Sequence, residues 1–305
     1  MGHVGAHPEQ VAWIEVRPDD RADRRAQLQQ RVPHLGGRSF KQAAAAQGKE
    51  RIAAEERAVL GEARREGDQY VVNGTKWHVT SYNLADYLFV QAVLENGEFA
   101  GEHVLLVVDL PWPGVEVVRT PHYSHHIADE HPIVAFTDVR VPVANLIGEE
   151  HKGFKTFMTN FNGERLGMAA QAVAYAQVCF DEALHWARQR STFGAPLSTR
   201  QVIRHKLMDM LRAIDVARCH VYDLAWAQQH NHGDPNLRVA RIAMAKVEST
   251  RCMQFCADSA VQILGGMGFM RGTKSERIYR EVKVMMIGGG SEEIMKDLAA
   301  RQLGI

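Results

Sequence analysis

The chain has 305 residues, 46% of them hydrophobic, which is enough to bury a substantial core and to form between one and three domains. Its 36 basic and 36 acidic residues cancel, so no overall charge favours nucleic acid or an anionic membrane as a partner. The most apolar run, HVLLVVDL, is too short to cross a bilayer, and the N-terminus has no signal pattern. We therefore expect a cytoplasmic protein without a membrane span.

The first segment, residues 1–62, is rich in Ala, Arg and Gln and shows only weak apolar periodicity. Its aromatic side chains are few. We expect an atypical segment that packs poorly or is disordered.

Residues 63–150 carry strand patterns. In QYVVNGTKWHVT, Asn73 and Gly74 lie between two β-prone runs, and an Asn-Gly pair in that position is a strong signal for a two-residue hairpin turn. Further strands are predicted in YLFVQAV, HVLLVVDL, GVEVV and PIVAFTDVRVP. We expect a small, partial antiparallel β-domain, built as a sandwich or a barrel.

Residues 151–305 show a helical period of apolar residues. The first helix is predicted from about Glu164 to Arg190, the second from Thr199 to Gln229, and the third from Pro235 to Leu264, with a fourth beginning at Ser291. Long amphipathic helices with short connections predict an antiparallel four-helix bundle. The expected fold class is therefore α+β.

Two groups of potential metal ligands are better explained as structural. HYSHHIADEH holds four histidines beside Asp129 and Glu130, but their spacing fits no standard ligand set, so a polar loop is expected. Cys252 and Cys256 lie four residues apart on one helical face without a second pair, which favours small core residues. The other cysteines, Cys179 and Cys219, also lie in predicted helices, as in a reduced protein. No metal site is predicted.

The residues alone leave other features open. The triplet Gly288 to Gly290 precedes a Ser-Glu-Glu helix start and could bind a phosphate or form a plain loop. Glu164 could complement a helix dipole or act as a base. Polar residues around RQRSTFGAPLSTRQ would ordinarily lie on a solvated helix end.

Several ordered motifs in residues 66–305 resemble the acyl-CoA dehydrogenase family, in the type with its base on the bundle helix. They are EGDQYVVNGTKWHVTS, AFTDVRVPVANLIGEEHKGF, ERLGMAAQAV, RSTFGAPLSTRQ, AVQILGGMGF and IGGGSEEIM. The resemblance implies an N-terminal helical domain, a middle β-domain and a C-terminal four-helix bundle. It also implies FAD held across a subunit interface of a homodimer or homotetramer, an acyl-CoA substrate that gains an α,β double bond, and electron-transfer flavoprotein as the acceptor.

The resemblance also implies which residues act on the substrate. Many members carry their catalytic glutamate at the position of Gly289, whereas long-chain and branched-chain members carry it at the position of Glu164. We therefore expect Glu164 to remove the α-proton, reaching into the space that Gly289 leaves, and to be strengthened as a base by burial beside the acyl chain. The backbone N–H of Gly289 is expected to stabilise the thioester oxygen.

Cofactor and substrate contacts follow from the same resemblance. Beside the flavin of their own subunit we expect His78 and Thr80, and a further FAD-contacting pair is Ser291 and Glu293. FAD of the neighbouring subunit would contact Arg190, Thr192, Phe193, Gln201, Gln262, Gly265 and Gly266. CoA would contact Phe161, Asn162 and Arg165.

The sequence also departs from the family pattern. Residues 1–60 contain no counterpart of the helical domain, and the β-domain's flavin loop, which normally hydrogen-bonds the flavin, is also missing from the sequence. We interpret the start as truncated or frame-disrupted, and expect weak FAD binding with little activity. The alternative function is a non-catalytic remnant or binding scaffold. A flavin oxidase or monooxygenase fits less well, because Glu164 and the CoA-contacting stretch are both in place.

Overall fold

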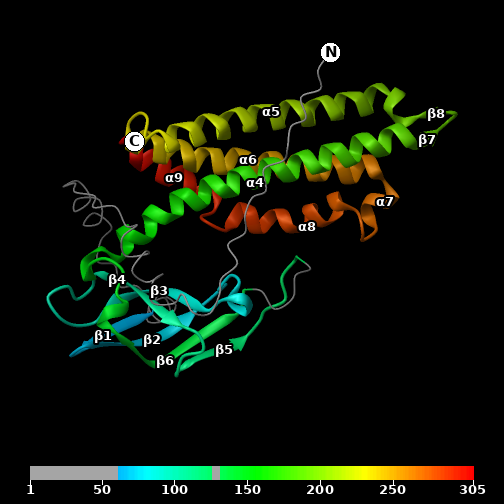
Figure 1. Ribbon diagram of the computed structural model, residues 1–305. Helices are drawn as coiled ribbons and strands as arrows, with labels where there is room; N and C mark the ends of the chain where they lie inside the picture. Colours follow the sequence, from blue (N-terminus) through cyan, green and yellow to red (C-terminus); the bar gives the residue numbers. More distant parts are fainter. Residues whose placement is uncertain (1–60, 126–130) are drawn as a thin grey trace, which may run out of the picture.

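The computed structural model describes residues 61–125 and 131–305, which form a β-rich part and a long helical part (Figure 1). The prediction for residues 1–62 falls almost entirely outside the described residues, as do His126, Asp129 and Glu130 of the histidine-rich motif. The described elements confirm the α+β class, with an antiparallel-rich sheet followed by a helix bundle.

The β-rich part is one curled sheet of six strands in the order β4-β3-β1-β2-β6-β5, rather than a sandwich or a barrel. Neighbouring strands are antiparallel except β1 and β3, which run parallel over two residue pairs. One face carries the core side chains Tyr70, Val72, Leu106 and Phe136. The strands are β1 (Glu62–Glu66), β2 (Gln69–Lys76), β3 (Tyr87–Leu94), β4 (His103–Asp109), β5 (Val115–Arg119) and β6 (Ile133–Pro142).

The predicted hairpin at Asn73 and Gly74 is wrong. The turn lies at residues 67–68, where Glu66 pairs with Gln69, and β2 runs on through Gly74 with a shift of register. Asn73 explains the difference, because its Oδ1 accepts a 2.8 Å hydrogen bond from the backbone N–H of Asp138 on β6. The side chain thus pairs two strands at a bulge instead of closing a turn.

Four helices form the bundle: α4 (Gly153–Gln189), α5 (Gln201–Gln229), α6 (Pro235–Leu264) and α8 (Lys274–Ile287). The third helix was predicted with its observed bounds. The first begins eleven residues before Glu164, and the fourth bundle helix is α8, which the sequence analysis missed. Ser291 instead caps α9 (Glu292–Leu303), a shorter helix packed on α6.

Shorter elements connect the strands and helices of the described residues. The α4–α5 connection contains β7 (Ser191–Thr192), β8 (Ala195–Pro196) and the 3-10 turn η5 (Leu197–Thr199), and α7 (Gly266–Phe269) precedes α8. Three further 3-10 turns border the sheet: η2 (Tyr82–Leu84), η3 (Val143–Asn145) and η4 (Glu150–Lys152).

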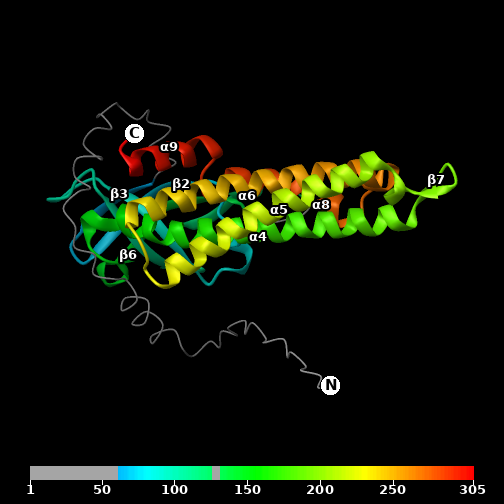
Figure 2. The ribbon, with the colours of Figure 1, turned by 90° about the horizontal axis from the view of Figure 1, so that it is seen from above.

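Small side chains bring α4 and α6 close together. Ala169, Ala172 and Ala176 of α4 are fully buried and face the equally buried Ala257 and Ala260 of α6. Cys252 and Cys256 are buried in the same cluster, which confirms them as small core residues. The turned view shows these helices lying side by side along the length of the bundle (Figure 2).

Gly153, the first residue of α4, joins the two parts of the molecule. A Cβ atom built on it would lie 2.5 Å from the backbone carbon of Val104 and 2.6 Å from the carbonyl oxygen of His103, both on β4. Only glycine permits this approach of helix to strand. The start of α4 is therefore seated directly on the sheet backbone.

Candidate active site

Glu164 lies inside α4, so its predicted place at a helix start is wrong and it cannot complement the dipole of the first turn. Its side chain is exposed, and its burial beside an acyl chain stays a prediction. Within the described residues it accepts one hydrogen bond, 2.6 Å long, from Nδ2 of Asn160 one turn earlier. The carboxylate is held on one side and accessible on the other.

The glycine loop between α8 and α9 lies against the same stretch of α4. A Cβ on Gly289 would meet Sδ of Met168 at 2.9 Å, and Met168 is one helical turn after Glu164. Gly289 and Gly290 have φ values of +67° and +119°, which L side chains adopt only with strain. The space beside Gly289 is thus occupied by the Met168 thioether.

Arg165 binds this loop directly. Its Nε donates a 2.9 Å hydrogen bond to the carbonyl oxygen of Gly289, and its guanidinium lies over the Phe161 ring at 5.2 Å from the centroid. The side chain is buried, which lowers the pKa of the guanidinium. Arg165 is therefore engaged within its own chain, although the resemblance suggested a contact with CoA.

Lys246 of α6 is a further residue at this loop, and the sequence analysis missed it. It is fully buried, and its Nζ donates to the carbonyl oxygens of Met286 at 2.8 Å and Gly290 at 2.6 Å. Burial, and secondarily the positive charge of Arg165, lowers the pKa of Lys246 to about 8. The available signal was a lysine among buried residues of a helix, between Ala245 and Val247.

His78 and Thr80 follow β2 at the other candidate region, where the structure adds three residues to them. His78 Nδ1 lies 2.9 Å from the Tyr123 hydroxyl, which donates to the carbonyl oxygen of His131 at 2.8 Å. His131 Nδ1 in turn lies 3.0 Å from the Thr80 hydroxyl. The His125 ring stacks on Tyr123. This is a connected polar and aromatic cluster, and no group of metal ligands occurs in the described part of the chain.

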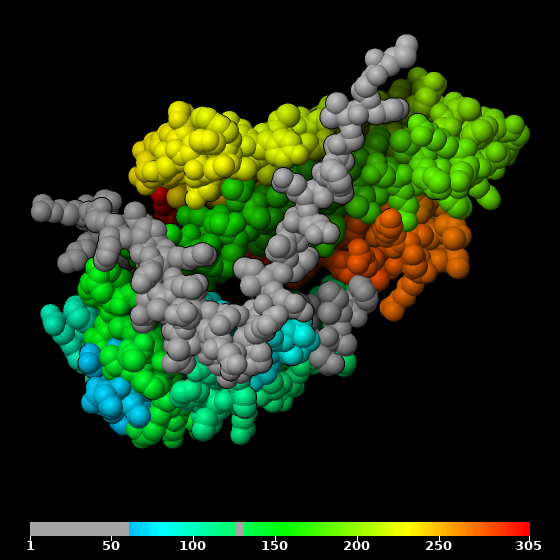
Figure 3. Space-filling view, viewed as in Figure 1, coloured from blue at the N-terminus to red at the C-terminus, as the bar shows by residue number. Residues whose placement is uncertain are grey.

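The residues expected to hold a neighbour's FAD gather at the far end of the bundle. Phe193 has a φ of +49° and is 99% exposed, and Arg190 forms no ion pair within residues 61–125 and 131–305. This end lies well away from the β-domain (Figures 1 and 3). The set comprises Arg190, Thr192, Phe193 and Gln201 around the α4–α5 connection, with Gln262, Gly265 and Gly266 at the end of α6.

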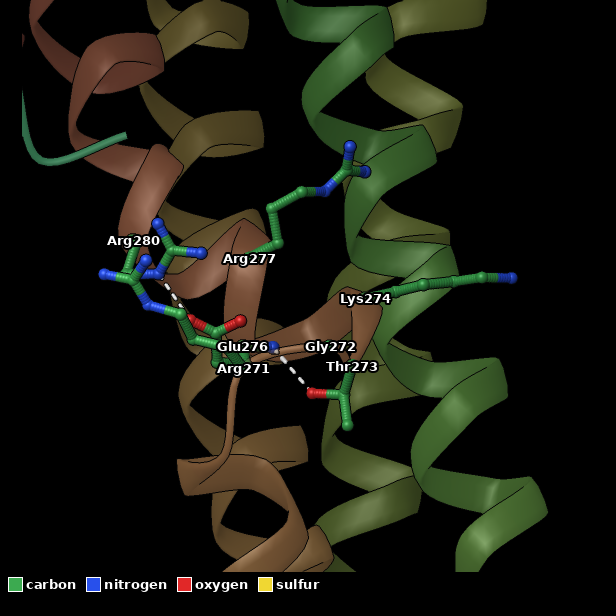
Figure 4. Close-up of a pocket in the computed structure, with 7 residues that line it drawn as sticks. All are labelled: Arg271, Gly272, Thr273, Lys274, Glu276, Arg277 and Arg280. Atoms are coloured by element: carbon green, nitrogen blue, oxygen red, sulfur yellow. Dashed lines mark hydrogen bonds and ion pairs between the residues drawn. The ribbon is translucent and has the colours of Figure 1, made fainter. Parts of the chain in front are cut away.

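A pocket of about 310 Å³ lies at the start of α8, whereas the glycine loop follows the end of that helix (Figure 4). Arg280 pairs with Glu276, whose backbone N–H donates to the Thr273 hydroxyl. Lys274 and Arg277 point away from that pair. The polar groups at the start of α8 thus already have partners within the chain. We therefore interpret the pocket as part of the helix cap and not as a ligand site.

Comparison with known proteins identifies the family. The model of the acyl-CoA dehydrogenase C-terminal domain matches residues 151–304. The chain belongs to the acyl-CoA dehydrogenase family. Members of this family are FAD-dependent flavoprotein oxidoreductases of fatty acid metabolism.

Individual relatives agree with the family model. The probable acyl-CoA dehydrogenase YngJ of Bacillus subtilis is 37% identical over 240 residues, 78% of this chain and 62% of that protein. The short-chain specific acyl-CoA dehydrogenase of Mus musculus mitochondria is 33% identical over 79% of this chain and 58% of its own. The chain thus spans about 60% of the length of these curated relatives.

Solved acyl-CoA dehydrogenases share the fold. A probable acyl-CoA dehydrogenase from Mycobacterium abscessus superposes with a TM-score of 0.74 at 40% identity, over 80% of this chain and 64% of its own. Butyryl-CoA dehydrogenase from Megasphaera elsdenii gives a TM-score of 0.76 at 29% identity, over 84% and 66%. Among the described helices, none is both long and apolar enough to cross a membrane.

Proposed function

We propose that the chain performs FAD-dependent α,β-dehydrogenation of an acyl-CoA thioester, with Glu164 as the α-proton base. One observation carries the proposal: the Gly289 loop is bound to α4 by Arg165, next to Glu164 and within a turn of Met168. A proton acceptor and a backbone donor therefore belong to two segments that Arg165 joins. Abstraction of an α-proton from a thioester requires one group of each kind.

The two groups have distinct roles. Glu164 accepts the α-proton, and Asn160 holds one carboxylate oxygen so that the other faces the substrate. The N–H of Gly289 has no acceptor among the described residues, so it is available to the thioester oxygen as negative charge develops there. Phe161 and Asn162, on the preceding turn of α4, provide the CoA contact, whereas Arg165 serves the loop.

The residues present fit FAD. Phe193 is an exposed aromatic side chain in a strained conformation, and Arg190 is an exposed cation, as a pyrophosphate and its attached groups would require of a partner surface. Gln201, Gln262, Gly265 and Gly266 complete that surface. His78 and Thr80 would flank the flavin of their own subunit. Ser291 and Glu293, which follow the glycine loop in the sequence, would form a further pair of FAD contacts. When bound, FAD supplies the acceptor for the hydride that leaves the β-carbon.

The separation of these two groups supports the assembly of several copies of the chain. His78 and Thr80 follow β2, whereas Arg190 and Phe193 belong to the α4–α5 connection around β7 and β8, which lies at the far end of the bundle (Figure 1). Because the two groups lie in separate parts of one chain, we propose a homodimer or homotetramer in which two chains contact each cofactor. Electron-transfer flavoprotein is the proposed acceptor, and a solved electron-transferring flavoprotein of Acidaminococcus fermentans is among the structural neighbours.

Exposure around the site favours a second candidate function, a scaffold that loads little FAD. Glu164 is exposed, and Trp77, Tyr87 and Phe89 of the β-domain are each at least 40% exposed. Water at Glu164 would screen charge and lower the rate. Under this alternative the bundle persists while flavin content and turnover are low.

Flavin content separates the two candidates. The chain is purified by gel filtration with added FAD, and flavin per chain is measured from visible absorbance. Loaded protein is then assayed for dye reduction with a series of acyl-CoAs. The enzyme requires turnover that Glu164→Gln reduces by about 10²-fold or more at unchanged flavin content. Glu248→Gln, which removes an exposed acid of α6, is the matched control. Flavin-free, inactive protein establishes the scaffold.

A further inference from the structure

Lys246 occupies a position that a hydrophobic residue would fill at less cost. It is 0% exposed, and among the described residues it forms no ion pair with a carboxylate. Burying an uncompensated ammonium group is expensive unless its hydrogen bonds serve a purpose. Both of its acceptors, the carbonyl oxygens of Met286 and Gly290, belong to the end of α8 and the glycine loop, 40 and 44 residues away.

The peptides around Gly289 are held on both sides. Before it, the N–H of Gly288 donates to the carbonyl oxygen of Val284 at 2.8 Å. After it, Arg165 binds the carbonyl oxygen of Gly289, and Lys246 binds that of Gly290. The peptide bearing the Gly289 N–H is thus the unpaired member of a row whose neighbours are fixed. Its donor can keep one direction without an acceptor of its own.

We propose that Lys246 is a positioning residue, which holds the Gly289–Gly290 loop so that the N–H of Gly289 points at the thioester oxygen. The inference rests on the proposed function and extends it to a residue 44 positions away from its loop partner. Arg165 reaches the loop from α4 and Lys246 reaches it from α6, so the donor is fixed between two helices. A preorganised donor of this kind does not have to reorient as charge develops.

Packing of the bundle alone does not explain why residue 246 is a lysine. A methionine at position 246 would fill similar space and leave no buried charge, so the bundle alone gives no reason for a lysine. Without Lys246 the carbonyl oxygens of Met286 and Gly290 lose a shared donor. The loop, with two glycines at positive φ, then has the conformational freedom to turn the Gly289 N–H away.

Two measurements on the full chain test the proposal with Lys246→Met. Amide hydrogen exchange is followed across residues 286–295, and binding is measured for an acyl-CoA and for its thioether analogue, which lacks the carbonyl oxygen. We expect loop amides to exchange about tenfold faster while α5 amides are unchanged. We expect the preference for thioester over thioether to fall about tenfold, because one directed hydrogen bond is lost.

Lys283→Met is the matched control, since Lys283 is an exposed lysine on the last turns of α8. It should change neither measurement. Unchanged exchange and unchanged preference in Lys246→Met would overturn the positioning role. If the original chain shows no preference for the thioester, the donor role of Gly289 fails, and the proposed function fails with it.

Two measures protect the test against misfolding of Lys246→Met. Lys246→Gln keeps a polar, uncharged side chain with one donor group and is compared in the same two measurements. In the unmodified chain, the Gly290 amide, which donates to Ile287 at 3.2 Å, must exchange as slowly as the last amides of α8. Rapid exchange there would contradict the proposal without any substitution.

Discussion

Glu182 of α4 accepts hydrogen bonds from the backbone N–H of Ser275 at 2.7 Å and from its hydroxyl at 2.6 Å. It also accepts from the N–H of Lys274 at 3.0 Å. A carboxylate from one helix therefore satisfies the free N–H groups at the start of another, as a capping residue does within a helix. This contact attaches α8, and through it the glycine loop, to α4.

Replacing Glu182 with alanine should therefore destabilise the bundle. We expect a loss of about 1–2 kcal/mol in the free energy of unfolding, since the Ser275 groups are buried and lose their acceptor. Urea denaturation followed by circular dichroism measures it. Asp181→Ala, which removes an exposed acid one residue earlier, should cost far less, and equal losses would show that the cap adds nothing.

A side chain at Gly289 is predicted to be costly for two separable reasons. Gly289→Ala places a Cβ near Met168 and forces a residue other than glycine to a φ of +67°. We expect about 1–3 kcal/mol of destabilisation. In a Met168→Ala background the steric part should vanish while the φ penalty stays, so a double-mutant cycle should give a coupling energy of about 1 kcal/mol. A coupling of zero would place the cost in the backbone alone.

Stability at alkaline pH should depend on Lys246. Its pKa is about 8 in the folded chain, against the usual lysine value of 10.5, because burial disfavours the charged form. Between those pH values the unfolded chain binds more protons, so the free energy of unfolding rises with pH. Relative to Lys246→Met, the original chain should gain about 1–3 kcal/mol from pH 7.5 to 10.5.

The difference in the free energy of unfolding between the original chain and Lys246→Met isolates the contribution of Lys246. Lys76, whose pKa is also lowered to about 8 by burial, contributes in the same direction to both and cancels. Urea denaturation at four pH values suffices. A constant difference across this range would mean that Lys246 titrates near its usual value.

Phe193→Ser should leave the bundle intact but weaken assembly and flavin binding. The ring is 99% exposed, so its removal should change the free energy of unfolding by less than about 0.5 kcal/mol. The molar mass measured by light scattering and the flavin content per chain should both fall if a neighbouring chain covers this residue. Val216→Ser, at an exposed position on α5, is the control. A monomer that binds FAD equally well in both variants would reject the cross-subunit contact.

Helices whose ends are marked by capping residues could be predicted from the sequence. α6 was predicted with its observed bounds because Asp234 accepts from the N–H of Leu237 and Pro235 occupies the first turn, while Gly265 ends the helix. α8 was missed although Thr273 and Glu276 form the first half of a capping box, because charged residues dilute its apolar period.

Contacts between distant segments set what the sequence did not predict. The start of α4 depends on Gly153 lying against β4, and the register of β2 depends on Asn73 bonding to β6. Lys246 has partners 40 and 44 residues away, both of them backbone carbonyls, which leave no residue pattern. Family motifs pointed to Glu164 and Gly289, but the position of the Met168 side chain beside Gly289 became visible only in three dimensions.

The close contact of Gly153 with the backbone of β4 fixes one end of α4. Its 37 residues form one continuous rod of about 55 Å, which carries Glu164 near the anchored end and leads to Arg190 at the other. A tilt of about 1° at the anchor would move the far end by about 1 Å. The positions of Glu164 and Arg190 would thus both depend on how Gly153 lies against the backbone of one β-strand.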